Sequence, residues 1–253
     1  MKKLSDNYIY INTQRGVAFL NSDFDYKEIH DIVNKPELLF ENAKIYKDSR
    51  TTKAGVAEIK FNGKSEEVFL KSFNNKGFIY TIRYIFREPR PYRVIRAAEA
   101  IKSVGVSTPQ PIAGIVDKKF GVIPENAYLL RESVNGIIST LDYFKIMLDN
   151  EELVVEYLDS VLAMFAKLHK SGIFHGDSKC SNVYVCKNEN GSYHYGIWDL
   201  LSCQIGSTPV SQRLRDQEIA RFANSFAEIA KRLEKPLPKE GELDNIFVRY
   251  YKK

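Results

Sequence analysis

Acidic, basic and amide side chains with chemically useful spacing stand between residues 175 and 182, in the order His-Gly-Asp-Ser-Lys-Cys-Ser-Asn. Asp177 is a candidate general base, because a carboxylate can accept the proton of an attacking hydroxyl group. Lys179 can meet the negative charge that develops on a phosphoryl group. Asn182 and the later Asp199 carry the oxygen atoms that Mg²⁺ prefers as ligands. These are the groups that transfer of a phosphoryl group to a hydroxyl requires.

The spacing His-x-Asp-x-Lys-x-x-Asn, followed by a second Asp, is typical of a kinase catalytic loop. Asp177 or Asn182 alone would fit a residue that merely caps a loop. The four polar residues together, framed by strands, favour catalysis over that simpler interpretation. We expect His175 to anchor the loop by hydrogen bonding to backbone and assign it no chemistry.

The segments on either side of this loop must position it. Apolar residues recur at spacings of three and four between residues 151 and 170, which predicts an amphipathic helix. Residues 183–185 and 193–200 read as strands joined by a turn rich in Asn and Gly. Such a hairpin would bring Asn182 and Asp199 together, as two ligands of one metal site require.

A second set of candidates lies upstream and suits nucleotide binding. Lys71 ends the apolar run Val-Phe-Leu and resembles the strand lysine that holds the α- and β-phosphates of ATP, although an ordinary strand-end lysine is the simpler alternative. Strands are expected at 44–47 and 56–61, and the loop 48–55 between them would cover the phosphates, with Ser49 and Gly55 as candidate contacts. Because this loop holds one glycine, a plain surface turn fits equally well.

The strand lysine of a kinase pairs with an acid on the following helix, here predicted over residues 91–104. Glu99 is the acid inside that helix, and Glu88 is the alternative. The strand 128–132 would then enter a hinge, so that Glu132 and the neighbouring backbone meet the adenine ring.

The chain resembles the lipopolysaccharide core kinases, the family that acts on heptose or Kdo sugars of the inner core. The resemblance covers roughly residues 44–226. It implies an α+β, two-lobed, protein-kinase-like fold with a small β-rich N-lobe and a mostly helical C-lobe. It also implies ATP- and Mg-dependent phosphorylation of a sugar hydroxyl, with Lys71 holding phosphates, Asp177 as base, and Asn182 and Asp199 binding metal. It is carried by the Lys71 strand and the segments 92–98, 105–113, 128–130, 168–177 and 215–216.

We therefore expect an N-terminal extension at 1–40, a nucleotide-binding N-lobe at 41–132, and a C-lobe at 133–253 with the catalytic loop and acceptor site. Gly176 occupies the position at which protein kinases carry an arginine that binds an activation-loop phosphate. No Ala-Pro-Glu segment follows Asp199. Both features favour a small or lipid-linked acceptor over a peptide. A protein or small-molecule kinase of the same fold and a nucleotide-binding pseudokinase stay open as alternatives.

Composition sets further bounds. The 253 residues are 44% hydrophobic and 27% charged, as in ordinary globular proteins. No apolar run is long enough to cross a membrane, and the polar start of the chain argues against a signal peptide. Three cysteines without a Cys-x-x-Cys pair indicate reduced thiols in the cytoplasm and no zinc site. The sequence does not indicate the acceptor sugar or the oligomeric state.

The net charge of +5 is concentrated in one stretch, residues 77–96, where aromatic residues alternate with arginines. One interpretation is a helical connector with solvated arginines. The other is a contact with an anionic membrane surface, which would suit a peripheral enzyme on the cytoplasmic face of the inner membrane. Nucleic acid is the least favoured partner. The arginines are Arg83, Arg87, Arg90, Arg93 and Arg96.

Overall fold

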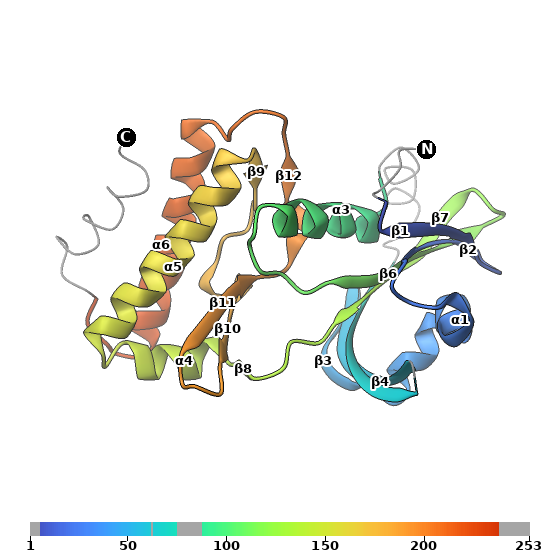
Figure 1. The fold of residues 1–253 in the computed structure, drawn as a ribbon, viewed down its shortest axis with the longest axis horizontal. Coiled ribbons are helices and arrows are strands. Elements are labelled where there is room, and N and C mark those ends of the chain that lie inside the picture. The colour runs from blue at the N-terminus through green and yellow to red at the C-terminus, as the bar shows by residue number, and fades with distance from the viewer. Residues whose placement is uncertain (1–5, 62, 75–87, 238–253) are drawn as a thin grey trace. The chain divides into compact units, whose positions relative to one another are not determined.

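The computed structural model describes residues 6–61, 63–74 and 88–237 and divides the chain into two compact units. The N-terminal unit comprises Met1–Glu99 and Pro109–Ser133, and the C-terminal unit comprises Ala100–Thr108 and Val134–Lys253. Figure 1 shows that a large sheet dominates the first unit and that long helices dominate the second. A β-rich first unit and a mainly helical second unit confirm the predicted fold class.

The sheet of the N-terminal unit has seven strands in the spatial order β1-β2-β6-β7-β5-β4-β3, and all neighbouring strands are antiparallel. Alternation explains why these segments form strands: along β4, buried Ala57, Ile59 and Phe61 alternate with exposed Glu58 and Lys60. The strands are β1 (Tyr8–Asn12), β2 (Gly16–Asn21), β3 (Lys44–Ser49), β4 (Thr52–Phe61), β5 (Lys64–Phe73), β6 (Pro111–Lys119) and β7 (Ile123–Glu132).

Helices cover both faces of this sheet. On one face, Ile29 of α1 packs against strand residues such as Leu70, and all of these side chains are fully buried. On the other face, Ile95 of α3 packs against Phe19. Gly114 allows this approach, because a Cβ atom there would lie 2.8 Å from the Cδ1 atom of Ile95. The helices are α1 (Tyr26–Asn34), a 3₁₀ helix (Pro36–Phe40) and α3 (Arg90–Ser103), which continues into the C-terminal unit.

The unit boundaries differ from the expected lobes at two places. The described part of residues 1–40, an extension whose structure the sequence did not determine, contributes β1 and β2 to the sheet of the N-terminal unit. Residues 100–108 belong to the C-terminal unit, where the Ser107 carbonyl accepts a hydrogen bond from Ile197 N at 2.9 Å and the Ser107 hydroxyl lies 2.7 Å from that of Tyr184.

The C-terminal unit is built around α5, whose bounds coincide with the predicted helix at 151–170. Asn150 caps α5 by accepting from the backbone N–H groups of Glu152 and Leu153. Large aromatic side chains such as Tyr157 of α5 and Phe222 of α6 are fully buried. The helices are α4 (Thr140–Met147), α5 (Glu151–Lys170) and α6 (Gln212–Arg232), and the strands are β8 (Ile137–Ile138), β9 (Ile173–Phe174), β10 (Val183–Lys187), β11 (Tyr193–Ile197) and β12 (Gln204–Ile205).

Candidate active site

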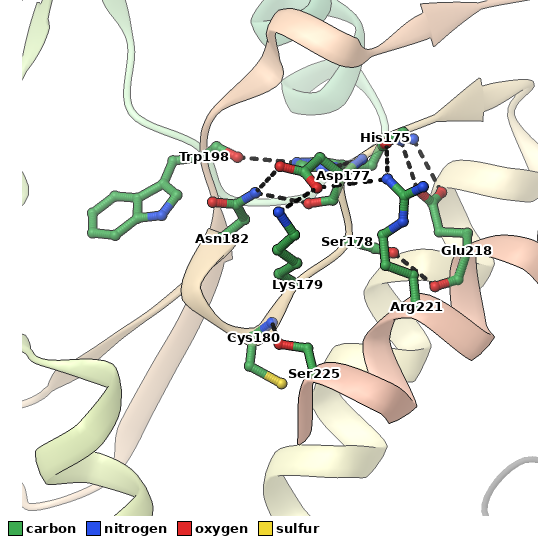
Figure 2. A network of polar contacts seen from close by, with 11 residues as sticks. His175, Asp177, Ser178, Lys179, Cys180, Asn182, Trp198, Glu218, Arg221 and Ser225 are labelled. Atoms are coloured by element: carbon green, nitrogen blue, oxygen red, sulfur yellow. Dashed lines mark hydrogen bonds and ion pairs between the residues drawn. The ribbon is translucent and has the colours of Figure 1, made fainter. Parts of the chain in front are cut away.

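The loop of residues 175–182 connects β9 to β10 and is anchored on α6 (Figure 2). Its second half ends in a 3₁₀ turn, in which Asn182 N donates to the Lys179 carbonyl at 2.8 Å. Cys180 fixes this turn: its side chain is fully buried and its backbone N–H donates to Ser225 Oγ of α6 at 3.2 Å. Burial raises the pKa of the Cys180 thiol to about 12, which makes it a packing residue and not a nucleophile.

Three of the residues selected from the sequence lie together in this loop. Lys179 Nζ is 3.2 Å from Asp177 Oδ1, and Asn182 Nδ2 donates to Asp177 Oδ2 at 3.1 Å and to the Asp177 carbonyl at 2.7 Å. These contacts, drawn in Figure 2, engage both oxygen atoms of the Asp177 carboxylate and fix its orientation. They do not use the side-chain oxygen of Asn182, which is the atom that a metal ion would take.

His175 links the loop to the end of the β10–β11 hairpin. Its side chain is buried, and Nε2 lies 3.0 Å from the Trp198 carbonyl, which can only accept. Nδ1 accepts from Asp177 N at 3.3 Å, so the bonds place the ring proton on Nε2. His175 thus holds the backbone of Asp177 next to the residue that precedes Asp199.

Asp199 lies two residues beyond the end of β11 at Ile197 and has left-handed backbone angles, φ 56° and ψ 54°. A residue with a Cβ atom adopts this conformation at a cost of roughly 1–2 kcal/mol, and such strain is concentrated at functional sites. Trp198 N donates to the Asn182 carbonyl at 3.0 Å, so the backbone of Asp199 leaves the hairpin beside Asn182. The hairpin therefore places Asn182 just before β10 and Asp199 just beyond β11, at the same end of two paired strands.

Glu218 of α6 is a buried residue that the sequence analysis missed. Its Oε2 atom accepts from His169 Nε2 at 2.9 Å and from His175 N at 3.0 Å, and its Oε1 atom accepts from Gly176 N at 2.7 Å. Ser178 Oγ donates to the Glu218 carbonyl at 2.7 Å. The side chain of Glu218 therefore fixes the two backbone N–H groups that lead into Asp177.

Arg221, one turn further along α6, was also missed. Its Nη1 atom donates to the Gly176 carbonyl at 2.6 Å and lies 3.5 Å from Asp177 Oδ1. Figure 2 shows Glu218 and Arg221 extending from the same helix to the loop. The catalytic-loop candidates thus depend on a helix more than forty residues later in the chain.

The donor set suits Mg²⁺ better than a transition metal. Asn182 and Asp199 supply one amide and one carboxylate, and Mg²⁺ commonly takes one or two protein ligands and completes its shell with phosphate oxygens and water. Within the described ranges, no group of three or more His, Cys, Asp and Glu side chains could hold a metal ion. The predicted ligands, one amide and one carboxylate, are of the kind that Mg²⁺ takes together with a nucleotide.

Lys71 lies in the middle of the N-terminal sheet. Strand register pairs it with Leu129, which in turn pairs with Gly114, so Lys71 is on the face that α3 covers. Glu99 of α3 accepts hydrogen bonds from Asn7 Nδ2 at 2.8 Å and Gln110 Nε2 at 3.3 Å. The alternative acid, Glu88, is ion-paired with Arg96. An acid partner for Lys71 stays a prediction.

The predicted phosphate-covering loop at 48–55 is wrong in extent. β3 continues to Ser49 and β4 begins at Thr52, and the turn is closed by Ser49 Oγ, which donates to the Thr52 carbonyl at 2.9 Å. Gly55 lies inside β4, where a Cβ atom would be 2.7 Å from the Lys44 carbonyl oxygen. Pairing of β4 with β5 as far as Phe73 extends the strand through residues whose local composition indicated a loop.

Glu132 ends β7 at the last residue paired with β5. Its N–H donates to the Gln110 carbonyl at 2.9 Å, and its carboxylate accepts from Gln110 N at 3.2 Å. Glu132 is thus fixed at the end of the strand that was expected to enter the hinge.

The basic and aromatic stretch 77–96 lies partly outside the described residues, including Arg83 and Arg87. In its described part, Arg96 pairs with Glu88, and the Arg90 guanidinium lies 5.5 Å from the centre of the Phe73 ring. Across the described ranges, none of the helices is long and apolar enough to cross a membrane.

The sheet unit, the helical unit and the loop with Asp177, Lys179 and Asn182 define a kinase-like phosphotransferase. The model of the lipopolysaccharide kinase (Kdo/WaaP) family matches residues 38–239, so the chain belongs to this family of kinases. A solved structure described as WaaP in complex with acyl carrier protein is similar at a TM-score of 0.59 and 13% identity. That match covers 86% of this chain and 82% of the other, and it shows a shared fold. A search of curated proteins found no match.

Proposed function

We propose that this lipopolysaccharide kinase transfers the γ-phosphoryl group of ATP to a hydroxyl of a heptose or Kdo sugar in the inner core. The observation that carries the proposal is the cluster in the loop, where Lys179 and Asn182 hold the two carboxylate oxygens of Asp177 at 3.2 and 3.1 Å. When a neutral hydroxyl attacks a charged phosphoryl group, a fixed carboxylate can accept the hydroxyl proton, and a neighbouring cation can stabilise the charge on the phosphoryl oxygens.

In the proposed reaction, Asp177 accepts the proton of the acceptor hydroxyl. The sugar oxygen forms a bond to the γ-phosphorus, the bond from that phosphorus to the β–γ bridging oxygen breaks, and ADP leaves with the electron pair. The ammonium group of Lys179 turns toward the γ-phosphoryl oxygens, where it stabilises the negative charge that accumulates during transfer. Asn182 keeps the Asp177 carboxylate oriented through its bond to Oδ2.

We assign nucleotide binding to the N-terminal unit, with Lys71 on the α- and β-phosphates and Glu99 as its partner acid. The β3–β4 hairpin, with Ser49 at its turn and Gly55 in β4, would lie over the phosphates, and Glu132 would adjoin the adenine. Asn182 and Asp199 would hold Mg²⁺. When bound, this ion neutralises charge on the phosphate oxygens.

The acceptor is proposed to be the lipopolysaccharide core or its lipid-linked precursor, at the cytoplasmic face of the inner membrane. Gly176 replaces the arginine that binds the activation-loop phosphate of protein kinases, and this replacement supports a non-peptide acceptor. The segment 77–96, with its arginines and aromatic residues, is proposed to contact anionic lipid, and this part of the proposal rests on sequence alone.

The test is phosphate transfer from radiolabelled ATP to purified core oligosaccharide, with delipidated casein as the competing acceptor. We expect label in the oligosaccharide and an Mg²⁺ requirement. Asp177→Ala should lower turnover by about 10²- to 10⁴-fold, the usual contribution of a general base. Mg-ATP binding, measured by calorimetry, should change little, because Asp177 acts on the acceptor.

The matched control is Asp31→Ala, which removes a carboxylate whose side chain is 99% exposed on α1. Its turnover should equal that of the unaltered protein. Label in casein and not in oligosaccharide would favour a protein kinase, and ATP binding without any transfer would favour a pseudokinase. Undiminished turnover of Asp177→Ala would contradict the assignment of the base.

A further inference from the structure

Arg221 is the side chain of α6 that reaches the candidate base itself. Its Nη1 atom donates to the Gly176 carbonyl at 2.6 Å and lies 3.5 Å from Asp177 Oδ1. The side chain is 41% exposed, so the guanidinium stands at the surface of the loop and not inside the core. One nitrogen therefore contacts both the backbone that precedes Asp177 and its carboxylate.

The loop cannot supply a cation at position 176 on its own. Gly176 has φ +81°, which residues with a Cβ atom rarely adopt, and a Cβ atom there would lie 2.6 Å from the Ser202 carbonyl oxygen. An arginine at this position, as in protein kinases, would be both strained and obstructed. A second positive charge beside Asp177, in addition to that of Lys179, comes instead from a different element, α6.

Helix geometry explains why two side chains of α6 can both reach Gly176. Glu218 and Arg221 are three residues apart, so they share one face of the helix. Glu218 Oε1 accepts from Gly176 N at 2.7 Å, and Arg221 donates to the carbonyl of the same residue. Both polar backbone groups of Gly176 are thereby bound to α6, which orients the peptide that leads into Asp177.

The charges around Asp177 give Arg221 a role that Lys179 cannot fill. Lys179 Nζ lies 3.2 Å from the same carboxylate oxygen, Oδ1. In the proposed reaction Lys179 turns toward the phosphoryl group, and a flexible lysine cannot hold both partners in one position. Arg221 is tethered by its bond to the Gly176 carbonyl, so it stays beside Oδ1 when Lys179 moves.

We propose that Arg221 is the positioning residue of the catalytic carboxylate: it fixes Asp177 through the Gly176 carbonyl and compensates its charge while Lys179 serves the phosphoryl group. This inference rests on the proposed function, because it assigns Arg221 a part in that reaction. Arg221 acts through Asp177 and does not itself contact the reacting atoms.

The test compares Arg221→Gln and Arg221→Lys with Arg213→Gln, which removes the same charge from an exposed position of α6. Arg221→Gln should lower kcat by about 10- to 100-fold, the loss typical of a displaced catalytic group, with KM for ATP and for the acceptor changed by less than about threefold. Arg221→Lys keeps the charge and one donor and should recover part of kcat. Arg213→Gln should match the unaltered protein.

A double-mutant cycle with Asp177→Asn separates positioning from a general structural effect. If Arg221 acts through Asp177, Arg221→Gln should lower the residual rate of Asp177→Asn by less than about threefold, because residues that act as a unit are not additive. The same large penalty in both backgrounds would overturn the proposal, as would an Arg221→Gln variant that turns over like Arg213→Gln. Undiminished turnover of Asp177→Asn would instead refute the proposed base, so the two failures are distinguishable.

Discussion

Replacing Glu218 by glutamine tests whether a buried carboxylate organises the catalytic loop. The Glu218 side chain is 1% exposed and accepts three hydrogen bonds, two on Oε2 from His169 and His175 and one on Oε1 from Gly176. A glutamine has one accepting oxygen and one NH₂ group. Whichever way it is turned, its NH₂ group faces the backbone N–H of His175 or of Gly176, and two donors then meet.

The magnitude follows from these contacts. A buried donor left without an acceptor costs about 1–3 kcal/mol, and loss of the charged acceptor weakens the remaining bonds. Hydrogen bonds to a charged acceptor contribute about 1.5–3 kcal/mol each. We therefore expect Glu218→Gln to lower the free energy of unfolding by about 2–4 kcal/mol. Turnover should fall as well, since His175 and Gly176 set the position of Asp177.

The chain provides its own probe for this measurement. Trp198 is the only tryptophan, and it directly follows the β10–β11 hairpin, where its Nε1 atom donates to the Ser181 carbonyl at 2.8 Å. Urea unfolding followed by Trp198 fluorescence therefore reports on the loop region. The control is Glu228→Gln on the exposed side of α6, which should stay within about 0.5 kcal/mol of the unaltered protein. A Glu218→Gln variant as stable as this control would refute the reasoning.

Two further predictions concern the N-terminal unit and the basic segment. Burial raises the pKa of Asp117 to about 6 against the opposing charge of Arg15, so the folded protein binds this proton more tightly than the unfolded chain. The contribution of Asp117 to stability should therefore fall as the pH rises from about 4 to about 6, and Asp117→Asn should remove that contribution in urea titrations at the two pH values; a difference in stability between variant and unaltered protein that does not change with pH would contradict it. Liposomes with anionic lipid should sediment the protein at low salt, and charge reversal of Arg83 and Arg87 should weaken this. Equal sedimentation of the variant would rule out that contact.

Local pattern was sufficient for the elements that frame the loop. The spacing of apolar residues predicted the bounds of α5, because one face of that helix is buried along its length. This face includes Val154, Leu158 and Phe165. The hairpin was predictable from β-branched and aromatic residues on either side of an Asn- and Gly-rich turn. The loop motif itself was readable because its groups lie within eight residues of sequence.

The contacts between α6 and the loop could not be predicted from local sequence pattern. Glu218 and Arg221 are 42 and 45 residues from Gly176 in sequence, and no spacing rule connects them. One signal was present: Glu218 stands on the same helical face as Phe222 and Phe226, at spacings of four, so an acid interrupts an apolar stripe. A charged residue in a buried stripe requires partners, and here those partners are the loop backbone and His169.

The role of α6 bears on how the enzyme is controlled. In addition to Glu218 and Arg221, Ser225 of α6 accepts from Cys180 N, and Ser178 donates to the carbonyl of Glu218, so the helix holds the loop before and after Asp177. These contacts lie within one compact unit. A loop held in this way has no need of a phosphate-dependent switch to orient Asp177, the proposed base, which agrees with a glycine at position 176. We therefore expect full activity from protein that has been treated with a phosphatase, and a loss of phosphate transfer after that treatment would contradict this reasoning.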